Sequence, residues 1–261
     1  MRANPPKPKP PGSQAKHPTP APPTLSGAEP PAKAAWDNCT QTLARNTLVA
    51  GSQQLGLALS DAQIALLMAY LGLLHKWSKV YNLTAVRDPL EMVTLHLLDS
   101  LAVVPALLRH LDTPANTPAQ PMRLLDVGSG AGLPGVVIAI ACPHIQVTCL
   151  DAVAKKAAFV QQVAASLRQA NLRGLHQRIE HMDTPHAVVC SRAFASLADF
   201  VHGSAKALAP GGVWLALKGK APTEELSALG PEVDVFHVEQ LLVPGLDAQR
   251  CLVWMRTALP R

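Results

Sequence analysis

Cysteine is scarce in this chain, and the residues that occur are far apart. None of them belongs to a CxxC pair, which argues against a zinc site built on cysteine ligands. An odd number of scattered cysteines also argues against a disulfide framework. We therefore expect a reducing compartment, the cytoplasm, and no metal cofactor. The cysteines are Cys39, Cys142, Cys149, Cys190 and Cys251.

Long apolar runs are also missing. The longest candidates are broken by Gly, Pro or charged residues, so the sequence predicts no membrane-spanning helix. The basic N-terminus is not followed by the apolar segment that a secretory signal carries. The chain nevertheless has 261 residues, of which 48% are hydrophobic. It can therefore bury the core of one large domain, with or without an extension.

The net charge of +5 is unevenly distributed. Residues 1–35 hold five Lys or Arg against one acid, Glu29, so they account for +4 and the rest of the chain for +1. Residues 1–34 are rich in Pro and poor in large apolar side chains, which predicts a disordered leader. The leader is either simply solvated or an auxiliary contact to RNA phosphate. If the body binds nucleic acid, it must use a local basic patch.

The next region, residues 35–111, has a helical pattern. Ser60 and Gln63 form a capping-box pair, and apolar residues follow them at helical spacing. Asp88 precedes a proline, which marks a second helix start. We expect these helices to pack with the region 112–261 as one unit.

The pattern changes in residues 112–261. After a Pro-rich loop at 112–121, short apolar runs alternate with helical segments, which predicts a parallel sheet with helices on both faces. The last two runs are separated by a Pro-Gly turn and no long helix, so we expect a closing hairpin with at least one antiparallel strand. The expected strands are Arg123–Val127, Val147–Leu150, Ala187–Cys190, Val213–Leu217, Val233–Leu242 and Cys251–Ala258, and the expected helices are Val136–Ala141, Ala154–Gln169 and Leu197–Ala207.

The central motif is Leu124–Gly135, in which a buried strand leads into a glycine-dense turn and then a helix. Glycines let a backbone pass close to a ligand where a Cβ would clash. Asp126, near the end of the strand, can brace the turn or accept a hydrogen bond from a ligand ammonium. Asp151 follows the next strand, at roughly the 20-residue spacing from Gly128 that a nucleoside-binding βαβ unit has. An acid there can accept hydrogen bonds from both ribose hydroxyls.

Two ligand classes fit such a turn. Its last three glycines match the GxGxxG pattern of nicotinamide-dependent oxidoreductases, but a lone match is weak evidence. In that fingerprint the first glycine follows the strand directly, whereas here Asp126 and Gly128 occupy the position. The form Asp-x-Gly-x-Gly-x-Gly is instead typical of methyltransferases that use S-adenosylmethionine, a ligand without a pyrophosphate. A glycine turn without any ligand is the third interpretation.

Five blocks make the sequence more specific: Trp77–Asp88, His96–Leu101, Leu133–Gly135, Ser191–Leu197 and Leu217–Gly219. Together they resemble the RsmG (GidB) family, the 16S rRNA guanine-N7 methyltransferases. The resemblance spans roughly Gly56 to Trp254 and depends most on the Tyr-Asn-Leu-Thr and Ser-Arg-Ala-Phe blocks. The chain departs from the family at Thr113–Pro121, which is longer and richer in Pro.

The resemblance implies a Rossmann-like S-adenosylmethionine methyltransferase fold, with a mainly parallel seven-stranded sheet and an N-terminal helical extension. It implies methyl transfer from S-adenosylmethionine to N7 of the guanosine at position 527, in the 530 loop of 16S rRNA. Some cofactor contacts follow from the family and others from the loop and strand pattern. Those from the family are Gly128, Leu133, Ile179, Glu180 and Arg192, and those from the pattern are Gly130 and Asp151.

The residues agree with this chemistry. Guanine N7 has a free lone pair, so its methylation needs alignment and desolvation but no general base. Enzymes that methylate amino groups of bases often carry Asn/Asp-Pro-Pro-Tyr/Phe after the fourth strand, where this chain has Ser191–Phe194. Cys190 lies inside the strand and is expected to be a buried core residue rather than the nucleophile of a C5 methyltransferase.

Four side chains are further candidates for the reaction centre or the RNA site. Arg192 could hold the cofactor carboxylate or a phosphate in a bidentate way, or form a structural ion pair. Lys218 could contact RNA phosphate or be a solvated lysine. Phe194 could stack on the target base or belong to the core. His96 could pair with Asp99 on one face of a third predicted helix, as a structural pair or as part of the RNA site.

The expected partner is the 16S rRNA of the small ribosomal subunit, with no membrane. A monomer is expected because no exposed apolar stripe is evident. A methyltransferase for another RNA or for a small molecule is the main alternative. A non-catalytic nucleoside-binding or assembly protein is disfavoured by the intact set of Gly128, Asp151 and Glu180, and the nicotinamide oxidoreductase is the remaining alternative.

Overall fold

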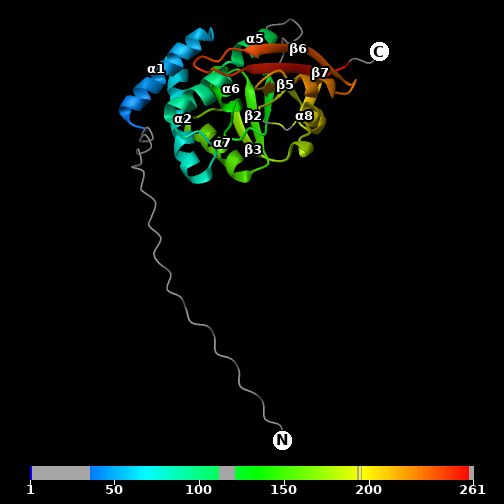
Figure 1. Ribbon diagram of the computed structural model, residues 1–261. Coiled ribbons are helices and arrows are strands. Elements are labelled where there is room, and N and C mark those ends of the chain that lie inside the picture. Colours follow the sequence, from blue (N-terminus) through cyan, green and yellow to red (C-terminus); the bar gives the residue numbers. More distant parts are fainter. Residues whose placement is uncertain (2–35, 112–120, 193, 195, 259–261) are drawn as a thin grey trace. The chain divides into compact units, whose positions relative to one another are not determined.

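The computed structural model describes Met1 and residues 36–111, 121–192, 194 and 196–258. The predicted leader except for Met1, and the predicted loop except for its last residue, lie outside the described residues. Among the described residues, seven strands form one sheet in the order β3-β2-β1-β4-β5-β7-β6 (Figure 1). The strands are β1 Arg123–Val127, β2 Gln146–Asp151, β3 Leu172–His176, β4 His186–Ser191, β5 Leu208–Lys218, β6 Val233–Leu241 and β7 Arg250–Thr257.

Strands β1 to β5 pair in parallel, whereas β7 is antiparallel to both β5 and β6. The strand order reverses between β1 and β4, and ligands of open α/β sheets bind beside such a reversal. The helical elements are α1 Asn38–Gln54, α2 Asp61–Tyr81, α3 Pro89–Met92, the π-helical η1 Val93–Leu98, α4 Asp99–Leu101, α5 Val104–Leu111, α6 Gly135–Ala141, α7 Ala154–Ser166, η3 Ile179–His181, α8 Leu197–Ser204, η4 Ala205–Ala207 and α9 Thr223–Ser227.

Two apolar clusters cover the two faces of the sheet. Successive side chains of a strand point to opposite faces, and β1 shows this clearly. Leu124 packs into the cluster formed with α1–α7, whereas Leu125 and Val127 pack into the cluster that contains α8. All three side chains are buried, so the central strand is covered on both sides, as a parallel sheet requires.

The N-terminal helices begin where their capping residues predict. The Ser60 side chain accepts from the Gln63 N–H, and the Gln63 side chain reaches back to the Ser60 N–H. The Asp88 carboxylate accepts from two N–H groups of α3. Helix α2 then packs against α6 and α7, and α4 packs against α6. Helices and sheet thus share one buried core.

The predicted strands are confirmed, with shifts at their ends. The expected hairpin is also present, as β6 and β7. Strand β3 was not among the predicted strands. Its residues alternate in burial and leave Arg173 and His176 exposed, so they form no continuous apolar run. Strand β5 begins five residues earlier than expected. Helix α7 ends at Ser166 rather than at Gln169, because Arg168 adopts a left-handed backbone angle.

One part of the chain corrects the expectation about membrane spans. The helical segment Pro89–His110 is long and apolar enough to cross a membrane, with a mean hydropathy of 1.5. However, 72% of its most apolar window is buried inside the fold. A core helix passes the same test, so packing against the rest of the core accounts for its composition.

Candidate active site

The glycine turn after β1 contains two kinds of glycine. A Cβ on Gly132 would collide with Val136, and a Cβ on Gly135 would collide with Cys149 and Asp126. A Cβ on Gly128 would meet nothing within 4 Å, yet its φ is +67°. The first kind is required by packing. Gly128 instead combines a left-handed backbone with open space, which fits a ligand passing close over the turn.

Asp126 stabilises this turn through a hydrogen bond to its backbone. Its side chain is fully buried, and its Oδ2 accepts a hydrogen bond of 2.8 Å from the Gly135 N–H. The other carboxyl oxygen is buried without a partner among the described residues. Burial therefore raises the pKa of the Asp126 carboxyl to about 7, although the bond to Gly135 opposes this. Of the two roles predicted for Asp126, the structure shows the brace.

Asp151 lies at the end of β2, as predicted, and is only 5% exposed. One carboxylate oxygen accepts from the Gly130 N–H at 2.9 Å, and the other accepts from the Val153 N–H at 2.8 Å. The Lys156 ammonium lies 3.8 Å away. A carboxylate has about four acceptor positions, so Asp151 can fix the turn and still accept hydrogen bonds from ribose hydroxyls.

The remaining predicted cofactor residues surround the same end of the sheet. Leu133 is buried in the glycine turn, and Ile179 is buried at the start of η3 after β3. Glu180, next to Ile179, is exposed. The open glycines, a carboxylate at the end of β2 and an apolar wall fit a nucleoside without a pyrophosphate. The residues present therefore fit S-adenosylmethionine.

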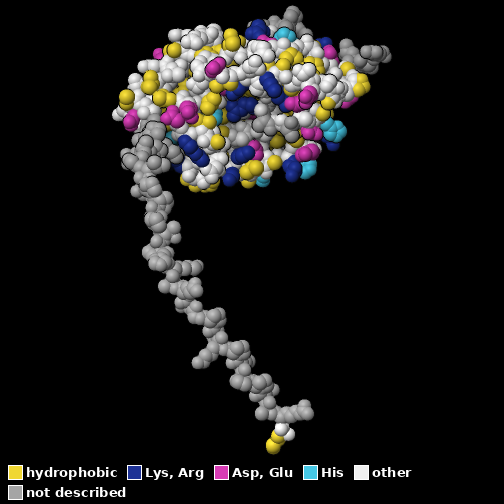
Figure 2. All heavy atoms as spheres, viewed as in Figure 1, with side chains coloured by type: hydrophobic (Ala, Val, Ile, Leu, Met, Phe, Trp, Pro, Cys, Tyr) yellow, Lys and Arg dark blue, Asp and Glu magenta, His cyan; other side chains and the backbone are white. Residues whose placement is uncertain are grey.

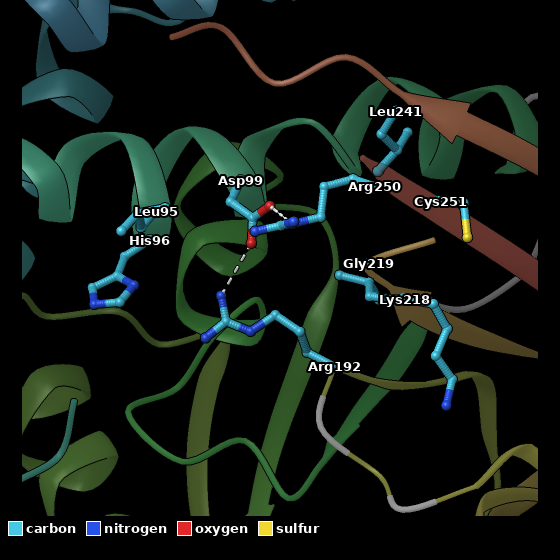
Figure 3. Close-up of a pocket in the computed structure, with 10 residues that line it drawn as sticks. Leu95, His96, Asp99, Arg192, Lys218, Gly219, Leu241, Arg250 and Cys251 are labelled. Carbon is cyan, nitrogen blue, oxygen red and sulfur yellow. Dashed lines mark hydrogen bonds and ion pairs between the residues drawn. The ribbon is translucent and has the colours of Figure 1, made fainter. Parts of the chain in front are cut away.

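Arg192 directly follows β4 and points into a pocket, where its Nη1 donates to Asp99 Oδ2 at 3.3 Å (Figure 3). A second arginine, Arg250 at the start of β7, donates from Nε to Asp99 Oδ1 at 2.7 Å. Asp99 is thus held between two guanidinium groups. The pocket has a volume of about 310 Å³ and is lined by Leu95, His96, Asp99, Arg192, Leu217, Lys218, Gly219, Leu241, Arg250 and Cys251.

The predicted pairing of His96 with Asp99 is wrong. The His96 Nε2 atom lies 2.8 Å from the Thr84 hydroxyl instead, and the Asp99 carboxylate is occupied by the two arginines. The two residues do share the pocket wall. Burial lowers the pKa of His96, so the ring is neutral at neutral pH. The helical spacing places His96 and Asp99 on one face. However, the guanidinium groups of Arg192 and Arg250 form stronger, charge-assisted hydrogen bonds with Asp99.

Lys218 and Phe194 both have partners within the protein. The Lys218 ammonium lies 2.8 Å and 3.0 Å from the two carboxylate oxygens of Glu225. The Phe194 ring is half-buried, with its centroid 5.6 Å from that of Phe200. Lys218 is therefore not a free solvated lysine. Cys190 is fully buried, and burial raises the pKa of its thiol, as expected of a core residue.

Sequence reasoning missed Arg250 and its link to Asp99. The antiparallel register pairs Lys218 with Cys251, so Arg250 comes to lie at the same edge as the end of β5. Only this pairing brings it beside the pocket. Figure 2 shows Lys and Arg side chains on the middle of one face, between α2 and α8 and beneath β6 and β7. Asp and Glu side chains lie among them in the same view.

A doubly covered sheet with one antiparallel strand, together with an open glycine turn and an acid at the end of β2, defines an S-adenosylmethionine-dependent methyltransferase. The chain belongs to the GidB family, described as rRNA small subunit methyltransferase G, whose sequence profile matches residues 63–253. Among the described residues, no group of three or more His, Cys, Asp or Glu side chains is arranged to hold a metal ion.

Relatives agree with this family. The chain is 63% identical over 209 residues to a Polaromonas sp. (strain JS666) protein, covering 80% of this chain and 92% of the relative. It is 62% identical over 210 residues to one from Albidiferax ferrireducens, covering 79% and 94%. Both are named ribosomal RNA small subunit methyltransferase G. TrmN from Thermus thermophilus aligns with a TM-score of 0.48 at 20% identity, covering 64% of this chain and 53% of TrmN, which is too weak to add to the family assignment.

Proposed function

We propose that this protein transfers the methyl group of S-adenosylmethionine to N7 of the guanosine at position 527 in the 530 loop of 16S rRNA. Its relatives are named for the small-subunit rRNA, and the family resemblance in the sequence supplies the atom and the position. The substrate is then the small ribosomal subunit or its precursor, met in the cytoplasm by a monomer.

The observation that carries the proposal is the chemistry of the pocket beside Arg192. Three cationic side chains line it, which suits the phosphates of RNA. Among the described lining residues, the two possible bases are Asp99 and His96, and the one His96 nitrogen without a hydrogen-bond partner, Nδ1, is buried. The Asp99 oxygens are held by Arg192 and Arg250, and the His96 Nε2 is held by Thr84. Methylation at N7 needs no proton acceptor, so this pocket suits that reaction better than methylation of an amino group.

The roles of the residues follow from their places. The bound cofactor supplies an electrophilic methyl group on its sulfonium. We assign the open turn at Gly128 and Gly130 to its amino-acid and ribose parts, Asp151 to the ribose hydroxyls, and Ile179 with Glu180 to the border of the adenine. Leu133 forms part of the apolar wall. Each of these residues helps to align the methyl group of the cofactor with the attacking nitrogen. Such alignment is the main contribution to the rate acceleration when no proton is transferred.

Arg192 lies between the proposed cofactor site at the glycine turn and the pocket proposed for the RNA. It follows the strand next to the glycine turn, and it also lines the pocket. It can therefore contact the carboxylate end of the cofactor or a phosphate of the RNA. Lys218 and Phe194 are proposed as contacts to phosphate and base, and His96 as a neutral side chain of the pocket wall. A cationic pocket makes a small-molecule substrate the weaker alternative.

The test is methyl transfer from labelled S-adenosylmethionine to small subunits from a strain that lacks this protein, followed by mapping of the modified nucleoside. Label on N7 of guanosine 527 is the expected result. Label on another nucleotide, or on another RNA in a total-RNA assay, would keep the cofactor and change the substrate. Binding of S-adenosylhomocysteine without any methylated RNA would overturn the RNA assignment.

A further inference from the structure

A single buried carboxylate joins two arginines that come from separate strands. Asp99 is 6% exposed, and each of its oxygens accepts from one guanidinium, of Arg192 after β4 and of Arg250 at the start of β7. Among the described residues, Asp99 is the only carboxylate within ion-pair distance of either arginine. The three side chains cross the pocket between the helix and the sheet (Figure 3).

The backbone under Asp99 is rigidly held. Asp99 follows the π-helical turn η1 directly and begins α4. Its neighbours Leu97, Leu98 and Leu101 are almost fully buried in the core. Single π-helical turns occur frequently at functional sites, where they change the direction in which side chains point. The position of the Asp99 carboxylate is therefore fixed by the core, whereas the two long arginine side chains would be free to move without it.

The charges at this point do not cancel. Two guanidinium groups share one carboxylate, while Lys218 is balanced by Glu225. The side chains of Arg192 and Arg250 are 30% and 28% exposed, so they keep N–H donors for a ligand. Two guanidinium groups held in a fixed orientation, with an excess of positive charge, match a phosphodiester, which is anionic and accepts several hydrogen bonds.

The reaction itself narrows the choice of ligand. Arginine usually recognises guanine through a bidentate contact to O6 and N7. Here N7 must keep its lone pair free to attack the methyl group, so an arginine fork on that edge would block the reaction. The backbone phosphate beside the target guanosine is the remaining anionic group for this pair.

We infer that Asp99 is a positioning residue that holds Arg192 and Arg250 in the orientation that receives one phosphodiester of the target RNA. The inference rests on the proposed function. By ordering both side chains before the RNA arrives, Asp99 lowers the entropy lost on binding and fixes the target nucleotide relative to the methyl group.

The test compares Asp99→Asn with Glu239→Gln as a matched control. Glu239 is also a largely buried acid that pairs with an arginine, Arg109, but it does not line the pocket. For Asp99→Asn we expect kcat on small subunits to fall by at least about tenfold. KM should change less than kcat does, because the added positive charge in the pocket opposes the weaker binding that follows from the loss of ordering, and the Kd of S-adenosylhomocysteine should stay within about twofold. Glu239→Gln should leave kcat unchanged.

A double-mutant cycle shows whether Asp99 acts through the arginines. In an Arg250→Ala background, Asp99→Asn should lower kcat much less than it does in the wild type, because the effects of coupled residues are not additive. Independent, additive effects would overturn the inference. A joint loss of melting temperature, cofactor binding and activity in Asp99→Asn would show a merely structural role and would also overturn it.

The two proposals fail in different ways. If wild-type protein does not methylate guanosine 527, the proposed function is wrong. The positioning role can then still be decided by NMR of the arginine Nε–H groups in the full chain. In the wild type, the chemical shift of the Arg250 Nε–H should differ from that of solvent-exposed arginines. In Asp99→Asn, this chemical shift should move to the value of solvent-exposed arginines. Identical spectra for the two proteins would exclude an orienting role for Asp99.

Discussion

The hydroxyl of Tyr70 donates a 2.8 Å hydrogen bond to the backbone carbonyl of Ala131. Tyr70 lies in the middle of α2 and is completely buried, and Ala131 belongs to the glycine turn. The N-terminal helices therefore do more than cover one face of the sheet. Through this bond, α2 fixes the turn that we propose as the cofactor's binding site.

Tyr70→Phe tests this link. The change keeps the ring and leaves the Ala131 carbonyl without its partner, which costs about 1–3 kcal/mol of stability for a buried group. We expect a lower melting temperature and a several-fold weaker Kd for S-adenosylhomocysteine, measured by calorimetry. Tyr81→Phe is the control, since Tyr81 is exposed and its hydroxyl has no hydrogen bond among the described residues. An unchanged Kd would limit Tyr70 to a stabilising role.

Gly128→Ala separates ligand clearance from backbone strain. Gly128 and Gly211 both have a left-handed φ, of +67° and +73°, and a Cβ on either meets nothing within 4 Å. Each alanine variant should lose about 1–2 kcal/mol of stability from strain alone. Only Gly128→Ala should abolish binding of S-adenosylhomocysteine, because its Cβ enters the space that the ligand needs. Equal binding by the two variants would remove Gly128 from the cofactor site.

Asp126 makes stability depend on pH. Its pKa in the folded protein, about 7, lies above the ordinary value of 3.8, so the folded state binds the proton more tightly than the unfolded state. Its contribution to stability is present below about pH 4 and is lost as the pH rises to about 7. One proton corresponds to at most about 1.4 kcal/mol per pH unit.

Asp126→Asn keeps an acceptor for the Gly135 N–H and cannot titrate. Between pH 5 and 7, the free energy of unfolding should fall less steeply with rising pH in this variant than in the wild type. Urea unfolding at several pH values measures the difference, in which the buried histidines cancel because both proteins contain them. Parallel curves for the two proteins would show that Asp126 is already ionised in the fold.

Local patterns explain why much of the fold was predictable. The capping residues Ser60 and Asp88 and the apolar runs determine helix starts and strands through neighbours in the sequence. The glycine turn and Asp151 were predictable because both their spacing and their chemistry are local to one βαβ unit. Strand β3 was not, since its alternating exposure gives no continuous apolar run.

The parts of the site that depend on distant residues were not predictable. Asp99 and Arg250 are 151 residues apart in the sequence, and only the antiparallel insertion of β7 beside β5 brings them together. His96 and Asp99 illustrate the opposite error. Their spacing on a helix suggested a pair, but Thr84 and the two arginines are the stronger partners that tertiary structure supplies.

Arg192→Ala should abolish methyl transfer and leave the fold intact. The side chain is about one-third exposed, and Asp99 keeps its shorter bond to Arg250 when Arg192 is removed. We therefore expect a change in melting temperature close to that of an ordinary surface substitution. Turnover on small subunits, measured beside the melting temperature, decides the matter. Near-normal turnover would make Arg192 a structural ion-pair residue only.

Glu225 pairs with Lys218, for which we propose a contact to RNA phosphate. Its carboxylate holds the Lys218 ammonium and also accepts from the Leu197 N–H at the start of α8. Glu225→Gln keeps an acceptor for Leu197 and removes the charge, so Lys218 becomes free to bind a phosphate. We expect a lower KM for small subunits in this variant, and a plot of log KM against log salt that is steeper by up to about one unit.

Lys218→Gln should act in the opposite direction, with a higher KM and a shallower salt dependence. Asp234→Asn is the control, because Asp234 pairs with Arg256 away from the pocket and its loss changes the net charge as much as Glu225→Gln does. It should leave KM unchanged if the effect is local. A rise in KM for both Glu225→Gln and Lys218→Gln would mean that the ion pair itself shapes the pocket. Lys218 would then support the β5 end of the site rather than contact the RNA.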